Sequence, residues 1–262
     1  MKILTFGNQK GGVGKTTGAV TVAAGLATRG HSVLLVDAEE QGHATVSLGV
    51  RQNPALYDLL VKGAPWRDVL HAVEPERYGG AGPRTNLYLI GSNVDTRKIA
   101  TNVDSAWILA ERLSELAVVG KNGRPFFDYV IIDTAPTPGD LHALIYLATD
   151  YLLCPTELEY LSLDGVRETL LRIRAVRAAY NKELNLAGII PNKFRAVSIE
   201  HRRNLEELNL HYPGQVWNPI PQSVVWSEAP YYGVPVFAYV PNHDAAGHAW
   251  ELIDEVEAVC NG

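Results

Sequence analysis

The chain has 262 residues, of which 47% are hydrophobic and 20% are charged, an ordinary composition for a globular protein. Its formal net charge of −6 argues against a protein that coats nucleic acid constitutively, but leaves room for a local basic patch. The two cysteines, Cys154 and Cys260, are too far apart for a CxxC metal motif or a disulfide framework. No apolar run is long enough to span a bilayer and no signal peptide is recognisable, so we expect a reducing, cytoplasmic location without membrane contact.

Strands and helices alternate along the chain. Residues 3–7 form a short apolar run that predicts a buried strand, and a glycine-rich loop follows it. Residues 16–29 predict a helix of small apolar residues that ends at Gly30. Further continuous apolar runs occupy residues 32–36, 129–132, 150–154 and 186–190. Such runs suit strands covered on both faces, so we predict an α/β fold, a mostly parallel twisted sheet flanked by helices, in a single domain over residues 1–262.

One segment, residues 74–84, interrupts this alternation. It combines glycines, prolines and charged residues, a mixture typical of irregular surface loops. We predict such a loop there, and the segment is too short to be a convincing linker between domains.

Three polar features lie where predicted strands end. The glycine-rich loop follows the first strand, Asp37 follows the second, and Asp133 follows the run over residues 129–132. Ligands of parallel sheets bind at the carboxyl ends of the strands. The positions therefore predict one site that contains all three features.

The glycine-rich loop reads Lys10-Gly11-Gly12-Val13-Gly14-Lys15-Thr16-Thr17. Glycines between a strand and a helix let backbone N–H groups surround phosphate oxygens, and the positive end of the helix dipole adds to the attraction. In such a loop Lys15 reaches the β- and γ-phosphates and the Thr16 hydroxyl ligates Mg²⁺. The ordinary pattern has glycine at the position of Gln9, whereas here Lys10 leads the loop. We predict a site for ATP and Mg²⁺, the alternative being a glycine-rich turn with incidental lysines.

The loop resembles that of the deviant Walker A ATPases, the ParA/Soj/MinD family of P-loop NTPases. Residues 33–45 look like the switch I segment of the family, and residues 127–136 look like its Walker B strand and switch II. Residues 220–230 and 232–236 resemble the C-terminal segment of ParA-type partition proteins. The resemblance thus covers most of the chain, and residues 60–125 are the part without a recognisable signature.

The resemblance implies roles for individual residues. Asp133 would hold Mg²⁺ through water, and Lys10 would reach across a dimer to the ATP of the partner. Asn192 and Pro221 fall where the family contacts the adenine. Each role has an alternative: Asp133 could merely end a strand, Lys10 could neutralise phosphate within its own subunit, and Asn192 could be a turn residue.

Switch I departs from the family pattern. The family has two acidic positions there, and the second supports the attack of water on the γ-phosphate. Asp37 keeps the first position, but Glu39 occupies the second and Glu40 replaces the usual proline. Glutamate can still accept a hydrogen bond from water, but its carboxylate lies one methylene further out, and catalysis tolerates misplacement poorly. We expect the catalytic residues to be Lys10, Lys15, Asp37 and Glu39. Slow hydrolysis and a switch that hardly hydrolyses ATP both remain open.

Several branches of the family can be argued against. The nitrogenase-reductase and iron–sulfur carrier branches need cluster-ligating cysteines, and the spacing of Cys154 and Cys260 does not provide them. The membrane-cycling MinD branch ends in a basic amphipathic helix. Here the last helix is acidic beside an apolar stripe, so we expect it to pack on the core. The stripe consists of Ala249, Leu252, Ile253 and Val256. No helix-turn-helix domain precedes the loop, so we expect no operator-specific autoregulation. ParA-type positioning remains.

ParA-type positioning implies a homodimer on ATP, nonspecific binding to nucleoid DNA, and an adaptor or centromere-binding partner that stimulates release. Candidate DNA contacts are Arg167, Arg174, Arg177, Lys193, Arg195, Arg202 and Arg203. Arg167 and Arg174 share a helical stripe, but these basic residues could also be solvated faces balanced by nearby glutamates. Family members often carry arginines in the segment that matches residues 222–226, where none stands here. A second hypothesis is therefore an ATP-held dimeric switch that recruits a protein partner with little hydrolysis or DNA binding.

Overall fold

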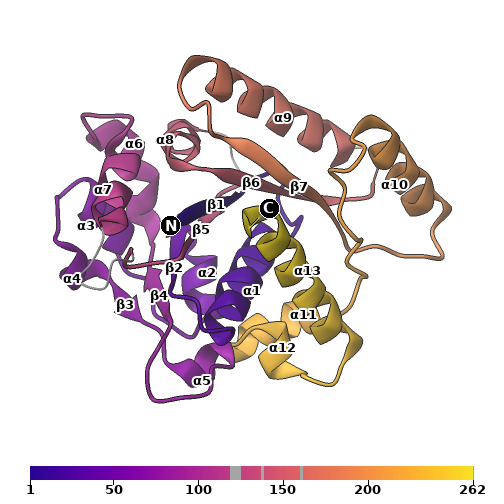
Figure 1. Ribbon diagram of the computed structural model, residues 1–262, viewed down its shortest axis with the longest axis horizontal. Helices are drawn as coiled ribbons and strands as arrows, with labels where there is room; N and C mark the ends of the chain where they lie inside the picture. The colour runs from indigo at the N-terminus through magenta and orange to yellow at the C-terminus, as the bar shows by residue number, and fades with distance from the viewer. Residues whose placement is uncertain (119–124, 137–138, 160–161, 262) are drawn as a thin grey trace.

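The strands form one sheet in the computed structural model, which describes residues 1–118, 125–136, 139–159 and 162–261 (Figure 1). Across these residues the sheet has seven strands in the order β3–β4–β2–β5–β1–β6–β7. The strands are β1 (Lys2–Phe6), β2 (Val33–Ala38), β3 (His71–Ala72), β4 (Leu87–Ile90), β5 (Tyr129–Thr134), β6 (Tyr151–Glu157) and β7 (Asn185–Asn192). β3 is antiparallel to β4, and the other neighbouring pairs are parallel. The predicted mostly parallel sheet is confirmed.

Both faces of the sheet are buried, as the continuous apolar runs predicted. Every residue of β2 is buried, and its successive side chains belong to different cores, Leu34 to one and Leu35 to the other. Successive side chains of a strand point to opposite faces of its sheet. A strand that is apolar at nearly every position therefore stabilises two cores at once.

The helices cover the two faces in separate groups (Figure 1). One face packs against α1 (Lys15–Thr28), α2 (His43–Ser47), α5 (Pro75–Tyr78), α11 (Val225–Glu228), η2 (Ala229–Tyr232), α12 (Val236–Tyr239) and α13 (Asp244–Asn261). The other packs against α3 (Ala55–Leu60), α4 (Trp66–Val69), α6 (Ile99–Asn102), α7 (Ile108–Ala117), α8 (Asp140–Ala148), α9 (Ser162–Ala179) and α10 (Ile199–His211), with the 3-10 helix η1 (Val94–Lys98) beside α3. The architecture is a helix–sheet–helix sandwich.

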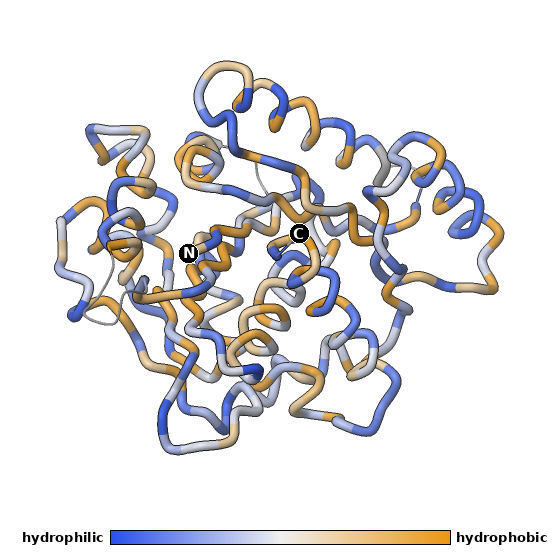
Figure 2. The backbone as a smooth tube through the Cα atoms, viewed as in Figure 1, coloured by the Kyte–Doolittle hydropathy of each residue, from blue (hydrophilic) through white to orange (hydrophobic). Residues whose placement is uncertain are grey.

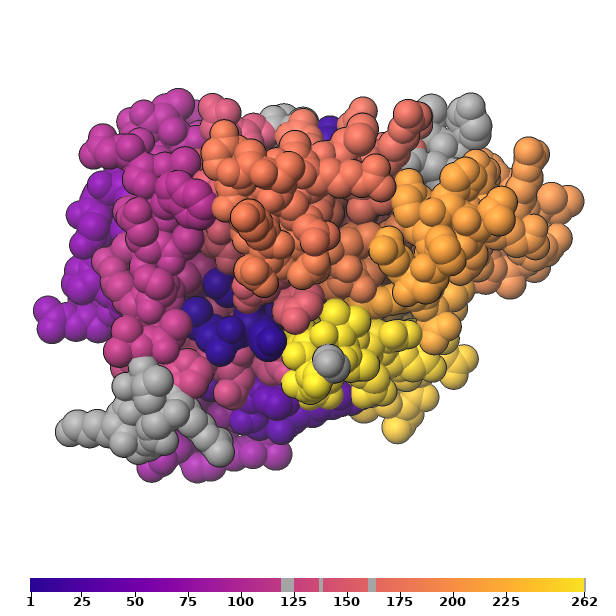
Figure 3. Space-filling view, turned by 45° about the horizontal axis from the view of Figure 1, so that its top comes forward, coloured from indigo at the N-terminus to yellow at the C-terminus, as the bar shows by residue number. Residues whose placement is uncertain are grey.

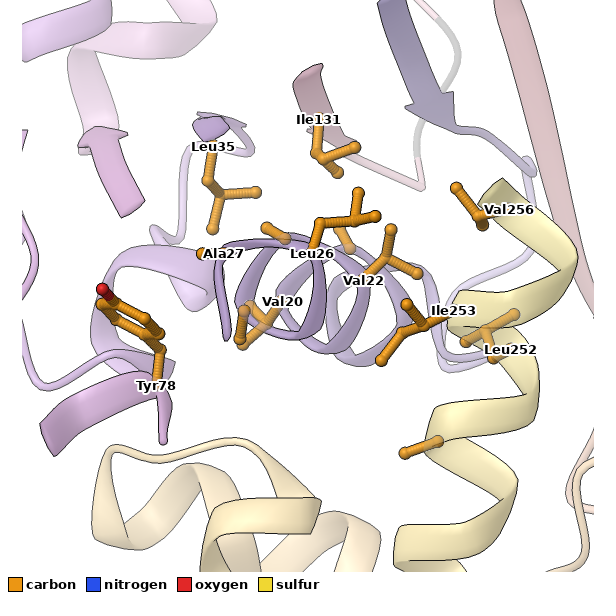
Figure 4. Packing of buried hydrophobic residues seen from close by; sticks show 14 of the residues in the cluster. Val20, Val22, Leu26, Ala27, Leu35, Tyr78, Ile131, Leu252, Ile253 and Val256 are labelled. Atoms are coloured by element: carbon orange, nitrogen blue, oxygen red, sulfur yellow. The ribbon is translucent and has the colours of Figure 1, made fainter. Parts of the chain in front are cut away.

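Helix α1 lies at the centre of its core, between the sheet and α13 (Figure 4). The two helices approach closely at Gly25, where an added Cβ would lie 2.0 Å from Ile253 Cδ1. The apolar stripe of the last helix is buried in this contact, as predicted: Ala249, Leu252, Ile253 and Val256. In the described part of the chain, no helix combines the length and the apolar character that crossing a membrane requires.

The prediction of an irregular loop over residues 74–84 is wrong in part. Its first residues form α5, which ends at Gly79 in the left-handed conformation with φ at 79°. Tyr78 is buried, and its hydroxyl accepts a hydrogen bond of 2.9 Å from the backbone N–H of Asn86. A single helical turn is too short to show a helical period. Strand β4, in the region without a signature, was not predicted because its four residues form too short a run to be recognised.

Candidate functional site

The glycine-rich loop connects β1 to α1 and requires glycine at two positions. Gly12 and Gly14 have positive φ, at 77° and 97°, and Gly14 is the N-cap of α1. A Cβ at Gly14 would lie 2.1 Å from Nδ2 of Asn192, which donates a hydrogen bond of 2.9 Å to the carbonyl of Val13. The first turn of α1 carries no acidic residue. Its N-terminus is therefore suited to an anion.

Lys15 is buried beneath the loop. Its side chain is folded against the loop backbone, and Nζ donates a hydrogen bond of 3.0 Å to the carbonyl of Lys10. Burial lowers the pKa of the Lys15 ammonium, and the carboxylates of Asp133 and Glu39 oppose this shift. The ammonium thus lies in a low-dielectric place beside acidic groups, where a phosphate would gain most from it.

Asp37 and Asp133 lie side by side on β2 and β5, where they are partners in the strand register. Oδ2 of Asp37 accepts hydrogen bonds from the backbone N–H and the hydroxyl of Thr45, at 2.8 and 2.7 Å. Neither carboxylate oxygen of Asp133 has a hydrogen-bond partner that meets the usual geometric limits among the described residues. Burial and then the charge of Asp37 raise the pKa of Asp133, while the nearby Thr16 hydroxyl and Lys15 lower it. Burial also raises the pKa of Asp37, and this effect outweighs the hydrogen bonds to its carboxylate, which lower the pKa.

These acidic groups fit a magnesium ion that arrives with a nucleotide. The buried carboxylate of Asp133, next to the Thr16 hydroxyl, offers the oxygen ligands that Mg²⁺ prefers. Among the described residues, no group of three or more His, Cys, Asp or Glu side chains could hold a metal ion. Mg²⁺ commonly takes few protein ligands and completes its shell with phosphate oxygens and water. Thr16 and Asp133 are the residues that would hold it, and the ion would neutralise charge on the phosphates.

Glu39 is held at both its backbone and its side chain. Its N–H donates to Oδ1 of Asp37 at 3.2 Å, and its carbonyl accepts from the hydroxyl of Ser92. Its Oε2 lies 2.6 Å from Nδ1 of His43, the first residue of α2. The second acidic position of switch I therefore lies next to the paired aspartates of β2 and β5. Its contact with His43 could not be predicted from the sequence.

Lys10 is paired within its own chain. Its Nζ lies 2.9 Å from Oε2 of Glu157 and 3.2 Å from Oε2 of Glu159. The other oxygen of Glu157, Oε1, lies 2.7 Å from Nζ of Lys193. Burial lowers the pKa of Lys10, but the hydrogen bonds and charges of the two glutamates outweigh it, and the pKa is raised. Glu157 is the last residue of β6, so it lies at the carboxyl end of a strand, as Asp37 and Asp133 do. It was not predicted as a site residue because the predicted strand ended at Cys154, three residues too early.

A cavity of 460 Å³ lies beside the loop, and we refer to it as the loop cavity. Its walls include Gly12, Gly14 and Thr17 of the loop and the apolar residues Pro155, Ile190, Ile220 and Trp226. Asn192 and Pro221, the two residues that we expect to contact the adenine, also line it. Nε1 of Trp226 has no hydrogen-bond partner among the described residues. Largely apolar walls with a few polar groups are typical of small-molecule sites, and this volume suits one. The remaining loop residues differ in access, with Gly11 exposed, Thr16 half-buried and Val13 buried.

The candidate DNA contacts occur in two places. Arg167 and Arg174 line a groove of 510 Å³ between α9 and α10, helices that are exposed on one face of the molecule (Figure 3). Arg177 on α9 and the pair Arg202 and Arg203 on α10 are also exposed. Both helices alternate hydrophilic and hydrophobic residues along their length (Figure 2).

The second place is a smaller hollow of 280 Å³ that contains Lys193 and Arg195. Glu157 and Glu159 line the same hollow, and Asp164 and Glu207 line the groove between α9 and α10. Basic and acidic side chains are therefore interleaved in both places, and in neither do the basic residues form an uninterrupted positive patch.

Comparison with known proteins identifies the family. A family model described as an AAA domain matches residues 1–186. The chromosome-partitioning ATPase Soj of Thermus thermophilus is 32% identical over 256 residues, which cover 97% of this chain and 95% of that protein. The chain belongs to the ParA/Soj/MinD family of P-loop ATPases. The sporulation initiation inhibitor protein Soj of Bacillus subtilis is also 32% identical, over 98% of both chains.

Solved structures share the fold of this family member. Apo McdA from Cyanothece superposes with a TM-score of 0.83 at 22% identity, over 98% of this chain and 99% of that one. The cell division ATPase MinD of Pyrococcus furiosus has a TM-score of 0.76 at 22% identity, with 98% and 99% covered. Cobyrinic acid a,c-diamide synthase from Mycobacterium smegmatis, solved with an ATP analogue and magnesium, has a TM-score of 0.71 at 25% identity, with 92% and 94% covered.

Proposed function

We propose that this protein is a ParA-type ATPase that dimerises on ATP and positions or partitions DNA or protein cargo. One observation carries the proposal: the glycine-rich loop, buried Lys15 and the buried carboxylate of Asp133 meet at one edge of the sheet. The Soj relatives, one of them named as a chromosome-partitioning ATPase, add support at full length.

In this proposal each part of the site has one task. The N–H groups of residues 10–17 and the N-terminus of α1 bind the phosphates, and Lys15 neutralises their charge. Thr16 and Asp133 hold Mg²⁺, and the adenine enters the loop cavity beside Asn192 and Pro221. Glu39 accepts a hydrogen bond from a water whose oxygen bonds to the γ-phosphorus while the bond to the leaving ADP breaks, which gives ADP and phosphate.

Lys10 connects this chemistry to dimerisation. In the structure its ammonium is paired with Glu157 and Glu159. In the proposed dimer it leaves these glutamates and contacts the ATP of the partner subunit, whose phosphates attract the ammonium across the interface. ATP then supplies the charge that holds two subunits together, and hydrolysis removes it.

Dimerisation would also double the number of basic residues presented to DNA. We assign nonspecific DNA contact to the exposed arginines of α9 and α10, and to Lys193 and Arg195 beside them. An adaptor or centromere-binding partner on the cargo would stimulate release, and the ATP-bound protein would be associated with the nucleoid in the cytoplasm.

A second candidate function is an ATP-held dimeric switch that recruits a protein partner with little hydrolysis or DNA binding. Two observations favour it. Glu39 stands where the family carries aspartate, and acidic side chains interrupt the basic residues in both candidate DNA sites.

DNA co-sedimentation with ATP, with ADP and without nucleotide separates the two functions. We expect ATP-dependent binding without sequence preference, and a log–log salt slope of roughly −0.9 for each phosphate neutralised. Reversing the charge of Arg167 and Arg174 should weaken binding. The matched control reverses Arg67 and Arg97, which are exposed on other elements and change the net charge equally. An ATP-bound dimer that ignores DNA at low salt would reject the partition function in favour of the protein switch.

A further inference from the structure

We propose that His43 is a positioning residue that holds the Glu39 carboxylate in place for the attack of water on ATP. This inference rests on the proposed hydrolysis. Glu39 occupies a position where the family carries the shorter aspartate.

The contact between the two side chains is short, and the side chains differ in their exposure to solvent. Nδ1 of His43 lies 2.6 Å from Oε2 of Glu39, four residues earlier. The Glu39 side chain is 11% exposed, whereas that of His43 is 62% exposed. The imidazole therefore lies on the solvent side of a carboxylate that is otherwise enclosed. A charge-assisted hydrogen bond in such a place is stronger than one between neutral groups in water.

The backbone between the two residues is built for this contact. Gly42 has φ at 62° and is the N-cap of α2, and this left-handed turn lets the side chain of His43 reach back to Glu39. A Cβ on Gly42 would lie 2.8 Å from Gln52 Cγ and 3.0 Å from the carbonyl oxygen of Ser92. The backbone of Glu39 is fixed separately by Asp37 and Ser92. His43 thus holds the carboxylate of Glu39, while Asp37 and Ser92 hold its backbone.

The consequence for hydrolysis follows from the extra methylene of glutamate. Glutamate has one more rotatable bond than aspartate, so its carboxylate loses more freedom when it is confined to one geometry. Nδ1–H of His43 donates to Oε2, and Oε1 can accept a hydrogen bond from water. A carboxylate that is already oriented needs less reorganisation at the moment of reaction, and misplacement by ~1 Å can cost up to ~10²-fold in rate.

Two variants of nearly the same shape test the hydrogen bond. In His43→Asn, Nδ2 takes the position of the imidazole Nδ1 and can still donate; in His43→Leu, a methyl group takes that position and cannot donate. We expect His43→Leu to lower kcat by roughly tenfold while the affinity for ATP stays unchanged, and His43→Asn to stay within about threefold of wild type. Val46→Ala, an exposed site on the same short helix, controls for disturbance of α2.

A measurement on the nucleotide-free protein tests the pair without any activity. At pH about 9, above the ordinary titration range of imidazole, long-range ¹H–¹⁵N spectra should show the His43 proton on Nδ1, and Glu39→Ala should remove this preference. A proton on Nε2 in the wild type, a His43→Leu variant as fast as wild type, or a His43→Asn variant as slow as His43→Leu would overturn the inference. Absence of ATP binding by the wild type would instead reject the proposed function, and the NMR result would still decide whether the pair exists.

Discussion

Replacing Glu157 by glutamine should strengthen the ATP-bound dimer, because Glu157 holds Lys10 within its own subunit. The Lys10 ammonium lies 2.9 Å from Glu157 and 3.2 Å from Glu159. A contact between Lys10 and the nucleotide of the partner subunit requires both pairs to break. Glutamine keeps the shape of the side chain and removes its charge, so Glu157→Gln destabilises the state in which Lys10 is held back.

The magnitude follows from the exposure of the two side chains. The Lys10 side chain is 30% exposed and that of Glu157 is 14% exposed, so the pair is partly shielded from water. Fully exposed pairs contribute ~0–1 kcal/mol, and we take about 1 kcal/mol for this one. Each dimer breaks the pair twice, so the change totals about 2 kcal/mol, or roughly 30-fold in the dimer dissociation constant.

A second substitution should act in the opposite direction. Lys193 binds the other oxygen of Glu157, and Lys193→Ala leaves that carboxylate to Lys10 alone. We expect this variant to dimerise more weakly than wild type. Light scattering over a concentration series, with a non-hydrolysable ATP analogue and no DNA, measures both variants. The reasoning is refuted if Glu157→Gln dimerises no more tightly than wild type, or if both variants shift the same way.

Substitutions at three other positions test the site. Lys15→Ala should abolish ATP binding, and undiminished affinity in a calorimetric titration would reject the loop assignment. Asp133→Asn should raise the melting temperature of the nucleotide-free protein while it weakens Mg²⁺-dependent nucleotide binding; a lower melting temperature with full affinity would contradict this. The pKa of Asp133 is raised by folding, so the charge of Asp133 lowers the stability of the folded protein at neutral pH. Below pH ~4 the carboxyl is protonated in both the folded and the unfolded protein, so Asp133→Asn should no longer raise the melting temperature there. Glu39→Ala should spare ATP binding and lower turnover by roughly 10²-fold, and equal rates would show that Glu39 is not catalytic. Because His43 holds the longer side chain, Glu39→Asp should also be slower than wild type, by up to ~10²-fold.

The phosphate loop and the paired aspartates could be predicted because strong local signals mark them. Glycines that need positive φ appear directly in the sequence, and Asp37 and Asp133 each end an apolar run that is long enough to recognise as a strand. In a parallel sheet, the ends of such strands meet at one edge. Assigning these strands was therefore enough to predict that the loop, Asp37 and Asp133 lie close together.

Contacts that depend on short elements could not be predicted in the same way. The Glu39–His43 pair requires α2, whose five residues are too few to show a helical period. Glu157 was missed because Pro155 and Thr156 interrupt the apolar run before β6 ends. The walls of the loop cavity come from residues such as Pro155 and Trp226, which are distant in sequence and become neighbours only through the tertiary fold.

In the proposed mechanism, ATP joins two copies of this chain through Lys10. Light scattering of the wild type and of Lys10→Ala, each with a non-hydrolysable ATP analogue and Mg²⁺, tests it most directly, with nucleotide affinity measured in parallel. We predict that the wild type doubles its mass with the analogue and stays monomeric with ADP, while Lys10→Ala binds nucleotide but remains a monomer. A Lys10→Ala variant that dimerises as well as wild type would show that Lys10 acts within its own subunit, and a wild type that stays monomeric with bound analogue would contradict the nucleotide-dependent dimer itself.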